Sequence, residues 1–273
     1  MNSFLLIDKP AGPTSNDVLN QLKRSLNIKK MGHIGTLDPF ATGLLVVGVG
    51  EALKYIPYLK EEPKVYEATL KLGVETDTLD LEGQVVAEKT VPALTLEIIR
   101  QAASKFIGAQ KQIPPMYSAK KIAGQALYKL ARAGEIIERK PCDITIHSLD
   151  ILGFHDAQIT FRVSSTRGTY IRVLGSDLAK ALGTCGHLTS LRRLSIGDFS
   201  VSNAGTTPAS IVDSLQHFPS LAIKKEDAVK LLQGKVLQQL HTTGIYRAES
   251  EGRFLGLVES SGNTLKALRM MST

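Results

Sequence analysis

The residues best suited to chemistry lie between Gly32 and Leu45, where a histidine, three glycines and one acid lead into an apolar run. Pro39 restrains the residue before it, Asp38, to extended backbone geometry. Glycines at this density serve tight turns or the close approach of a partner to the main chain. An acid on a stiff loop that leads into a buried strand is a candidate catalytic carboxylate. The same pattern also fits an Asx-type turn at the start of a strand.

The other reactive side chains do not indicate a metal or cofactor site. Asp77, Asp80 and Glu82 have a spacing that matches no calcium loop and favours a hydrogen-bonded turn. The six histidines lack metal-ligand spacing, and the sequence has no P-loop or dinucleotide fingerprint. Cys142 and Cys185 form no CxxC pair and are expected to be reduced thiols of a cytosolic protein. We therefore expect chemistry without a cofactor or metal.

The charge of the chain favours a polyanionic partner. Its 273 residues carry 33 Lys and Arg against 26 Asp and Glu, a net charge of +7. Residues 111–140 hold seven cations and two acids, which favours a nucleic-acid clamp with Lys120, Lys121 and Lys129 among its contacts. A surface hairpin with lysines for solubility is the alternative. The N-terminus lacks a cationic signal region and no stretch is long enough to span a membrane, so we expect a cytoplasmic protein.

Apolar periodicity predicts the elements that must position these groups, and their mixture indicates an α+β fold. Helices are expected after the N-cap candidates at 14–17, after Thr95 with Ile98 and Ile107 on the buried face, around 127–131, and from 171 to 182. Strands are expected at 4–7, 44–49, 66–72, 144–146 and 158–164. A change in composition near 203–220 marks a boundary, after which the pattern predicts a small β-rich module.

The stretch 32–45 resembles the catalytic loop of the bacterial tRNA pseudouridine synthase B family, whose usual form has Thr in place of Ile34 and Leu in place of Phe40. Further motifs of this family are matched in the expected order along the chain. They lie at 9–15, 66–80, 113–119, 168–172 and 191–193. Six ordered motifs make a specific match, whereas any one of them alone is weak.

The resemblance implies the pseudouridine-synthase fold, a mixed and mostly antiparallel sheet flanked by helices and loops. It implies a catalytic domain at 1–212, in which 111–140 is a basic insertion that clamps RNA. Residues 213–273 would then form a small C-terminal module similar to the PUA-like RNA-binding domain of the family, although the segment is short for such a domain.

The resemblance makes Asp38 the nucleophile, because a carboxylate can attack a nucleotide and later leave. Arg172 stands at a predicted helix start, where a cation is unfavourable to the helix dipole, and it would keep that carboxylate ionised and aimed. We therefore expect an Asp38–Arg172 ion pair closer than about 4 Å even without RNA. Tyr66 is expected beside this pair as a third catalytic residue.

The implied substrate is the T-loop uridine of tRNA, conventionally position 55, which must be flipped out of the RNA before a protein can act on it. Tyr66 would stack on the flipped base and Leu191 would pack against it. Tyr170 would line the pocket, and His33 would fill the space that flipped nucleotides leave. The partner is then the T-arm stem-loop of tRNA, with no obligate protein partner. Two alternatives stay open: a guide-RNA-dependent synthase subunit of a ribonucleoprotein, and a non-catalytic RNA-binding or RNA-folding module.

Overall fold

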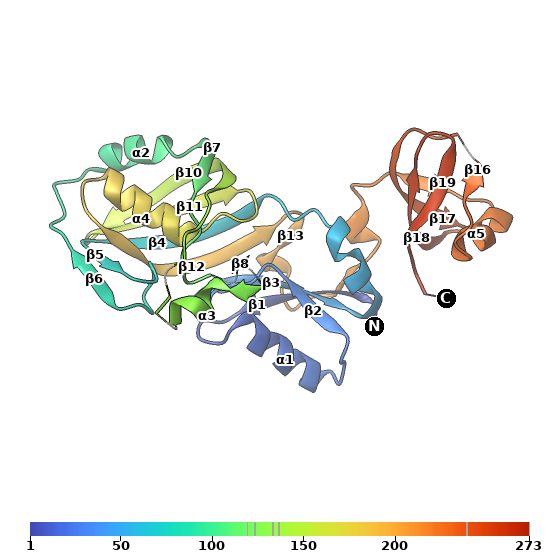
Figure 1. Cartoon of the computed structure of the whole chain (residues 1–273), viewed down its shortest axis with the longest axis horizontal. Helices are drawn as coiled ribbons and strands as arrows, with labels where there is room; N and C mark the ends of the chain where they lie inside the picture. The colour runs from blue at the N-terminus through green and yellow to red at the C-terminus, as the bar shows by residue number, and fades with distance from the viewer. Residues whose placement is uncertain (119, 123, 133, 136, 239, 273) are drawn as a thin grey trace.

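The computed structural model describes residues 1–118, 120–122, 124–132, 134–135, 137–238 and 240–272. Two bodies are visible, and each is built around its own sheet (Figure 1). The larger body holds a ten-stranded sheet with helices packed on it, and the smaller body holds the C-terminal strands. The expected α+β fold with a β-rich C-terminal module is confirmed.

The large sheet is nearly all antiparallel. Its strands are β1 Ser3–Lys9, β2 Met31–Ile34, β3 Thr42–Val49, β4 Lys64–Leu72, β7 Gly108–Gln112, β10 Cys142–His155, β11 Gln158–Ser165, β12 Gly186–Ile196, β13 Phe199–Ser200 and β14 Ala209–Ser210. They run in the order β14-β1-β3-β12-β4-β11-β10-β7, with β2 paired to β3 and β13 paired to β12. Among the described pairings of this sheet, only β3–β12 is parallel. This order places β3, β12 and β4 in the middle of the sheet.

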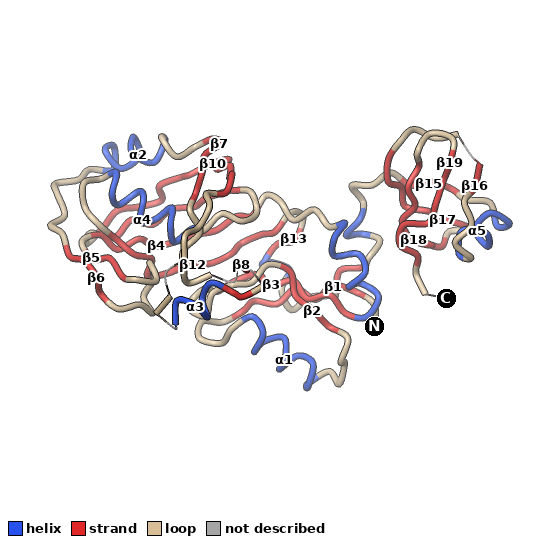
Figure 2. Tube along the Cα trace, viewed as in Figure 1, coloured by secondary structure: helices blue, strands red, loops and turns tan. Residues whose placement is uncertain are grey.

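Helices cover the large sheet in two places (Figure 2). Helix α2 (Leu96–Ser104) packs on β10, and α4 (Ile171–Ala181) packs on β12. Their buried side chains join a core that includes residues of β4 and β11. Helix α1 (Ser15–Ser25) packs near β2 and closes a second core against β3. Strand β3 reads as a nearly continuous apolar run because both of its faces are covered.

The start of α1 follows from its local sequence. The Thr14 hydroxyl accepts a hydrogen bond from the Asp17 amide at 3.1 Å, and the Asp17 carboxylate accepts one from the Thr14 amide at 3.0 Å. This reciprocal pair is a capping box, which satisfies backbone donors that the first helical turn leaves free.

No helix of the described residues is long and apolar enough to cross a membrane.

The basic segment 111–140 leaves the large sheet after β7. It contains the short strands β8 (Lys121–Ile122) and β9 (Gln125–Ala126) and the helix α3 (Leu127–Arg132). Leu127 and Leu130 are buried, so the predicted short helix is present and anchored. A separate hairpin, β5 (Val74–Thr76) with β6 (Val85–Glu88), follows β4.

The smaller body is a five-stranded sheet in the order β15-β17-β18-β19-β16, with α5 (Lys225–Leu232) packed against it. Its strands are β15 Ser220–Ala222, β16 Leu237–Gln238, β17 Gly244–Ser250, β18 Arg253–Ser260 and β19 Thr264–Met270. It contacts the 3-10 helix η1 (Gly50–Tyr58) of the larger body. There the Tyr55 ring centroid lies 6.0 Å from that of Phe254, and the Tyr55 hydroxyl donates to the Arg269 carbonyl at 3.2 Å.

The linker between the two bodies includes the short helix η3 (Asp213–Leu215). Leu215 packs into the core of the larger body, whereas the smaller sheet begins at Ser220. We therefore propose a division into two domains whose boundary lies between these two residues, within the stretch 203–220 where the composition changes and slightly later than the bound at 212 that the resemblance implied.

Candidate active site

Asp38 lies on the loop between β2 and β3, with one glycine in that loop and another at the start of β3. Gly35 and Gly43 adopt φ values of +66° and +99°, a region that residues with a side chain rarely occupy. At Gly43 a Cβ atom would collide with the main chain of Arg193 on the parallel neighbour β12. Turn geometry and a close backbone approach thus account for the two glycines that follow His33.

The ammonium group of Lys9 fixes the loop on the C-terminal side of Asp38. It donates hydrogen bonds to the carbonyls of Pro10 at 2.8 Å, Pro39 at 3.0 Å and Ala41 at 2.7 Å. Burial lowers the pKa of Lys9, and the nearby Asp38 carboxylate opposes this shift. A buried cation with three carbonyl partners ties the end of β1 to the residues that follow Asp38.

Ser15, the first residue of α1, fixes the loop on the other side. Its hydroxyl accepts a hydrogen bond from the Leu37 amide at 2.8 Å and lies 3.1 Å from the Leu37 carbonyl, to which it donates. Ser15 and Leu37 are both buried. Asp38 is therefore held between two anchored neighbours, Leu37 and Pro39.

The predicted ion pair is present, with Arg172 Nε 2.9 Å from Asp38 Oδ2. Arg172 is buried at the start of α4, and its other two nitrogens also have partners. Nη1 donates to the Thr78 carbonyl at 2.6 Å and lies 3.3 Å from Asp80 Oδ2, and Nη2 donates to the Tyr117 carbonyl at 2.7 Å. Because these partners fix the plane of the guanidinium, it holds the Asp38 carboxylate in one direction.

Two opposing influences set the ionisation of Asp38. Burial raises the pKa of its carboxyl, the Arg172 guanidinium opposes that rise, and the neighbouring Asp80 carboxylate adds to it. The net direction is upward, so Arg172 offsets the cost of burial without reversing it. The Asp38 side chain is still 36% exposed, against 4% for Arg172, so its carboxylate remains reachable from the adjoining cavity.

That cavity has a volume of about 220 Å³ and lies between the Asp38 loop, β4, β12 and the start of α4. Tyr66 and Leu191 contribute an aromatic and an aliphatic wall from adjacent strands, and Tyr170 contributes a further aromatic side chain. Such walls suit a flat nucleobase. The site residues predicted from the sequence that the structure gathers here are Asp38, Tyr66, Lys120, Tyr170, Arg172 and Leu191.

His33 is not among the residues that line the cavity. It lies on β2 opposite Val47, and its Nδ1 is buried without a hydrogen-bond partner among the described residues. Burial lowers the pKa of its ring. For Lys121 and Lys129 the backbone lies in β8 and α3, but their side chains fall outside the described part of the structure.

Asp80 is a site residue that the sequence pattern identified only in part. Its predicted turn is confirmed, because Oδ1 accepts from the Thr78 hydroxyl at 2.5 Å and from the Glu82 amide at 3.0 Å. Its second oxygen faces Arg172, a contact that the turn motif did not indicate. Lys9 and Ser15 were missed as site residues, and their only sequence signal was their place in the motif at 9–15.

Gln112 was also missed, and no sequence motif marked it. Its side-chain oxygen accepts from the Tyr170 amide at 2.7 Å, and its side-chain nitrogen donates to the Tyr170 carbonyl at 3.1 Å. Helix α4 has no side-chain cap of its own. Gln112 therefore fixes the peptide unit from which α4 and Arg172 start.

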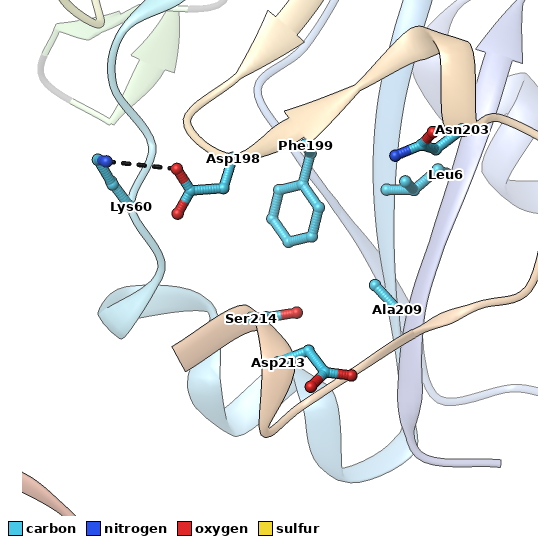
Figure 3. Close-up of a pocket in the computed structure, with 8 residues that line it drawn as sticks. All are labelled: Leu6, Lys60, Asp198, Phe199, Asn203, Ala209, Asp213 and Ser214. Carbon is cyan, nitrogen blue, oxygen red and sulfur yellow. Dashed lines mark hydrogen bonds and ion pairs between the residues drawn. The ribbon is translucent and has the colours of Figure 1, made fainter. Parts of the chain in front are cut away.

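Figure 3 shows a second hollow, of about 170 Å³. It shares no lining residue with the Asp38 cavity. It is lined by Leu6, Lys60, Asp198, Phe199, Asn203, Ala209, Asp213 and Ser214. Lys60 pairs with Asp198 at 3.3 Å. The Asp213 carboxylate accepts a hydrogen bond from the Ser210 hydroxyl, and the Asp213 amide donates one to that hydroxyl. Since these charges already have partners, we interpret the hollow as a packing gap. Among the described residues, no group of three His, Cys, Asp or Glu side chains is placed to hold a metal ion.

Comparison with known proteins gives consistent results at the level of sequence. The family model described as TruB family pseudouridylate synthase (N terminal domain) matches residues 23–171. A tRNA pseudouridine synthase B of Aromatoleum aromaticum is 45% identical, over 100% of this chain and 94% of that protein. One of Azoarcus sp. is 42% identical, over 100% of this chain and 96% of that protein.

Solved structures show the same fold at lower identity. An H/ACA RNP bound to a substrate RNA containing 2′-deoxyuridine matches with a TM-score of 0.73 and 19% identity, over 99% of this chain and 85% of that chain. A Cbf5-Nop10-Gar1 complex matches with a TM-score of 0.72 and 21% identity, over 99% and 84%. Taken with the sequence matches and the cavity around Asp38, these likenesses mean that the chain belongs to the TruB family of pseudouridylate synthases.

Proposed function

We propose that this chain converts a uridine of tRNA to pseudouridine, with Asp38 as the nucleophile. The observation that carries the proposal is the Asp38–Arg172 ion pair at 2.9 Å. The pair lines a cavity whose walls include Tyr66 and Leu191. The relatives named tRNA pseudouridine synthase B, at 45% and 42% identity over the whole chain, support tRNA as the substrate.

The reaction exchanges one bond of the ribose for another. The bond from C1′ to N1 of uracil breaks, a bond from C1′ to C5 forms, and a proton at C5 is replaced by one at N1. The change is an isomerisation, so it consumes no oxidant or reductant. Asp38 attacks the nucleotide as a carboxylate and leaves when the new bond is complete. Arg172 fixes the direction of that carboxylate throughout.

The walls of the cavity hold the base while it turns. Tyr66 stacks on the flipped base, Leu191 packs against it, and Tyr170 completes the wall near the start of α4. His33 lies two residues before Gly35, outside the cavity lining, where it can fill space that a flipped nucleotide vacates. The target is the T-loop uridine, position 55, in the T-arm of tRNA.

The phosphates of the tRNA provide the remaining affinity. In this proposal Lys120, Lys121 and Lys129 in the basic insertion contact the backbone of the T-arm. The C-terminal module extends the RNA-binding surface. The protein acts in the cytoplasm and needs no partner protein.

A second function is suggested by the solved structures that share the fold, since one is named as an H/ACA RNP and the other as a Cbf5-Nop10-Gar1 complex. In that case the chain would act as a synthase subunit that depends on a guide RNA. Those structures are only 19% and 21% identical to the chain, whereas the tRNA pseudouridine synthase B sequences reach 45%. A stand-alone enzyme is therefore the better-supported function.

One assay separates the possibilities. The purified chain is incubated with an unmodified tRNA transcript, without guide RNA or other protein, and pseudouridine is measured at each uridine. A transcript with cytidine at position 55 serves as the control for position. Product at position 55 alone supports the proposal. Product only after a guide ribonucleoprotein is added supports the second function, and tight binding without product would mean a non-catalytic RNA-binding module.

A further inference from the structure

We propose that Lys64 and Arg193 form a phosphate-binding site beside the Asp38 cavity, and that this site holds a phosphodiester of the flipped nucleotide. The inference rests on the proposed function, because it requires an RNA substrate in the cavity. It assigns a role to two buried cations that neither the motif analysis nor the geometry around Asp38 explains.

The two cations come from neighbouring strands and converge on one glycine. Lys64 starts β4 and lies on the same face as Tyr66, since side chains alternate along a strand. Arg193 on β12 is paired with Tyr66 in the sheet, and Lys64 and Arg193 both line the cavity that contains Asp38. An ideal Cβ built on Gly35 would lie 3.1 Å from Lys64 Nζ and 3.2 Å from Arg193 Nη1. A glycine there leaves the space between the two donors open.

Arg193 uses only part of its guanidinium within the protein. Its Nε donates to the Leu44 carbonyl at 2.8 Å, and Nη2 donates to the Gly35 carbonyl at 2.8 Å. Among the described residues, Nη1 makes no hydrogen bond. The side chain is therefore held in place by two of its nitrogens while the third faces the space beside Gly35.

Lys64 has less support from the protein than Lys9, whose buried ammonium donates to three carbonyls. The Lys64 side chain is only 10% exposed, yet the nearest carboxylate oxygen, on Glu61, is 3.9 Å away. No hydrogen bond of Nζ is present in the described part of the chain. Burial lowers the pKa of Lys64 and the adjacent Arg193 guanidinium lowers it further, while the carboxylates of Glu61 and Glu62 oppose this shift without reversing it. A buried ammonium beside a like charge is costly unless an anion joins it.

A phosphodiester fits what these two side chains offer. It carries one negative charge on two non-bridging oxygens, and charge-assisted bonds from an ammonium and a guanidinium can reach one oxygen each. Asp38 is not that anion, because Arg172 already holds it. Lys64 and Tyr66 are two residues apart on the strand, about 6.6 Å along β4. A nucleotide spans a similar length from its base to its phosphate, so a base stacked on Tyr66 brings its own phosphate to Lys64.

The site can be tested by pairing a protein variant with a modified RNA. Lys64→Met removes the charge and keeps the length of the side chain. Binding of a T-arm stem-loop is measured in an Asp38→Asn background, so that no product forms. Two further RNAs carry a neutral methylphosphonate in place of the phosphodiester on the 5′ side or the 3′ side of the target uridine. We expect one of these RNAs to bind the parent about tenfold more weakly than the unmodified stem-loop does. Adding Lys64→Met should weaken the binding of that RNA little further.

The control variant is Lys60→Met, which removes an exposed lysine paired with Asp198 (Figure 3). Lys60→Met should lose as much affinity for the methylphosphonate RNA as the parent does. The salt slope of binding should become shallower by about 0.7 to 0.9 for Lys64→Met alone. Without RNA, the melting temperature of Lys64→Met should equal or exceed that of its parent, because the substitution removes a buried charge whose nearest carboxylate oxygen lies 3.9 Å away.

The proposal would be overturned if each methylphosphonate RNA lost as much affinity for Lys64→Met as it loses for the parent. A melting temperature several degrees below that of the parent together with an unchanged salt slope would also overturn it, since Lys64 would then only brace the Gly35 turn. Failure of the proposed function has a different signature. In that case the unaltered chain makes no pseudouridine in any transcript, and the proposed phosphate site is then rejected together with the proposed function.

Discussion

Arg172 faces two carboxylates at once, Asp38 at 2.9 Å and Asp80 at 3.3 Å. One guanidinium cannot neutralise both, and the Asp80 side chain is nearly as buried as that of Arg172. The two acids consequently have different tasks. Asp80 and the carbonyls of Thr78 and Tyr117 hold the guanidinium, and the guanidinium in turn directs Asp38. At the residue scale, the activity therefore depends on the groups that fix Arg172 as well as on Arg172 itself.

Replacing Arg172 with lysine should not restore function, because an ammonium is a point charge that lacks the planar fork. We expect kcat of Arg172→Lys to fall about 100-fold, with KM within a few-fold, as for the loss of one preorganised donor. Steady-state kinetics on a tRNA transcript measure this. Arg162→Lys is the matched control, since Arg162 is exposed and pairs with Glu67 at 3.1 Å. A nearly active Arg172→Lys enzyme would mean that charge alone is sufficient.

The raised pKa of Asp38 should appear in the pH dependence of kcat/KM. The nucleophile must be ionised, so the rate should rise with pH through a group whose pKa lies above the ordinary aspartate value of about 3.9. Asp80→Asn removes a like charge and should move that acid limb to lower pH, whereas Asp77→Asn in the same turn should leave it in place. An acid limb that moves to higher pH in Asp80→Asn would contradict the assigned direction.

At the scale of elements, the Asp38 loop derives its rigidity from the ends of β1 and α1. Lys9 at the end of β1 and Ser15 at the start of α1 grip the main chain on both sides of the nucleophile. The capping box at Thr14 fixes the helix end that carries Ser15. A helix with no catalytic side chain therefore contributes to the position of the nucleophile.

Ser15→Ala tests this contribution. Leu37 loses both hydrogen bonds to the hydroxyl, and leaving its buried amide without a partner should cost about 1–3 kcal/mol of unfolding free energy. We also expect kcat to fall more than KM rises, because the loop that carries Asp38 loosens. Ser25→Ala at the exposed end of the same helix should change stability by less than about 0.5 kcal/mol. Denaturant unfolding and steady-state kinetics of both variants test this prediction. Equal unfolding free energies and equal kcat values for the two variants would mean that Ser15 does not position the Asp38 loop.

Local patterns predicted most elements, because caps, apolar periodicity and turn residues act over a few positions. The core strand β3 and the start of α1 at Thr14 are examples. The predicted buried face of α2 was partly wrong, because Ile98 and Ile107 are 45% and 50% exposed. Ile107 lies beyond the end of the helix at Ser104, and within the helix Ile99, Ala102 and Ala103 form the buried face.

Contacts between distant residues could not be read from such patterns. Arg172 joins Thr78 across 94 positions, and Arg193 joins Gly35 across 158. The Asp38–Arg172 pair was expected only because several motifs together resembled one family. Lys64 and Gln112 belong to no such expectation, and only the packing of the sheet brings them to the site.

At the scale of the whole molecule, the excess of positive charge should govern the affinity for RNA. Neutralising phosphates releases counterions, so binding should weaken steeply with salt. Replacing Lys120, Lys121 and Lys129 with alanine should make the salt slope shallower by about 0.7 to 0.9 for each lost contact. Filter binding of tRNA across a salt series measures this.

A triple alanine variant of Lys60, Arg162 and Lys180 removes the same net charge and is the control. These side chains are exposed and paired with Asp198, Glu67 and Glu75. It should keep nearly the original slope. An unchanged slope in the first triple variant would place the RNA footprint elsewhere on the molecule.

The most direct test of the account is single-turnover pseudouridine formation by Asp38→Asn, beside the unaltered chain, on a tRNA transcript without guide RNA. The substitution keeps the size of the side chain and removes the nucleophile. We predict that the unaltered chain modifies position 55, and that Asp38→Asn gives no detectable product while it binds tRNA within a few-fold of the original affinity. Product formation by Asp38→Asn at a substantial rate would show that another residue is the nucleophile and would contradict the assignment of Asp38.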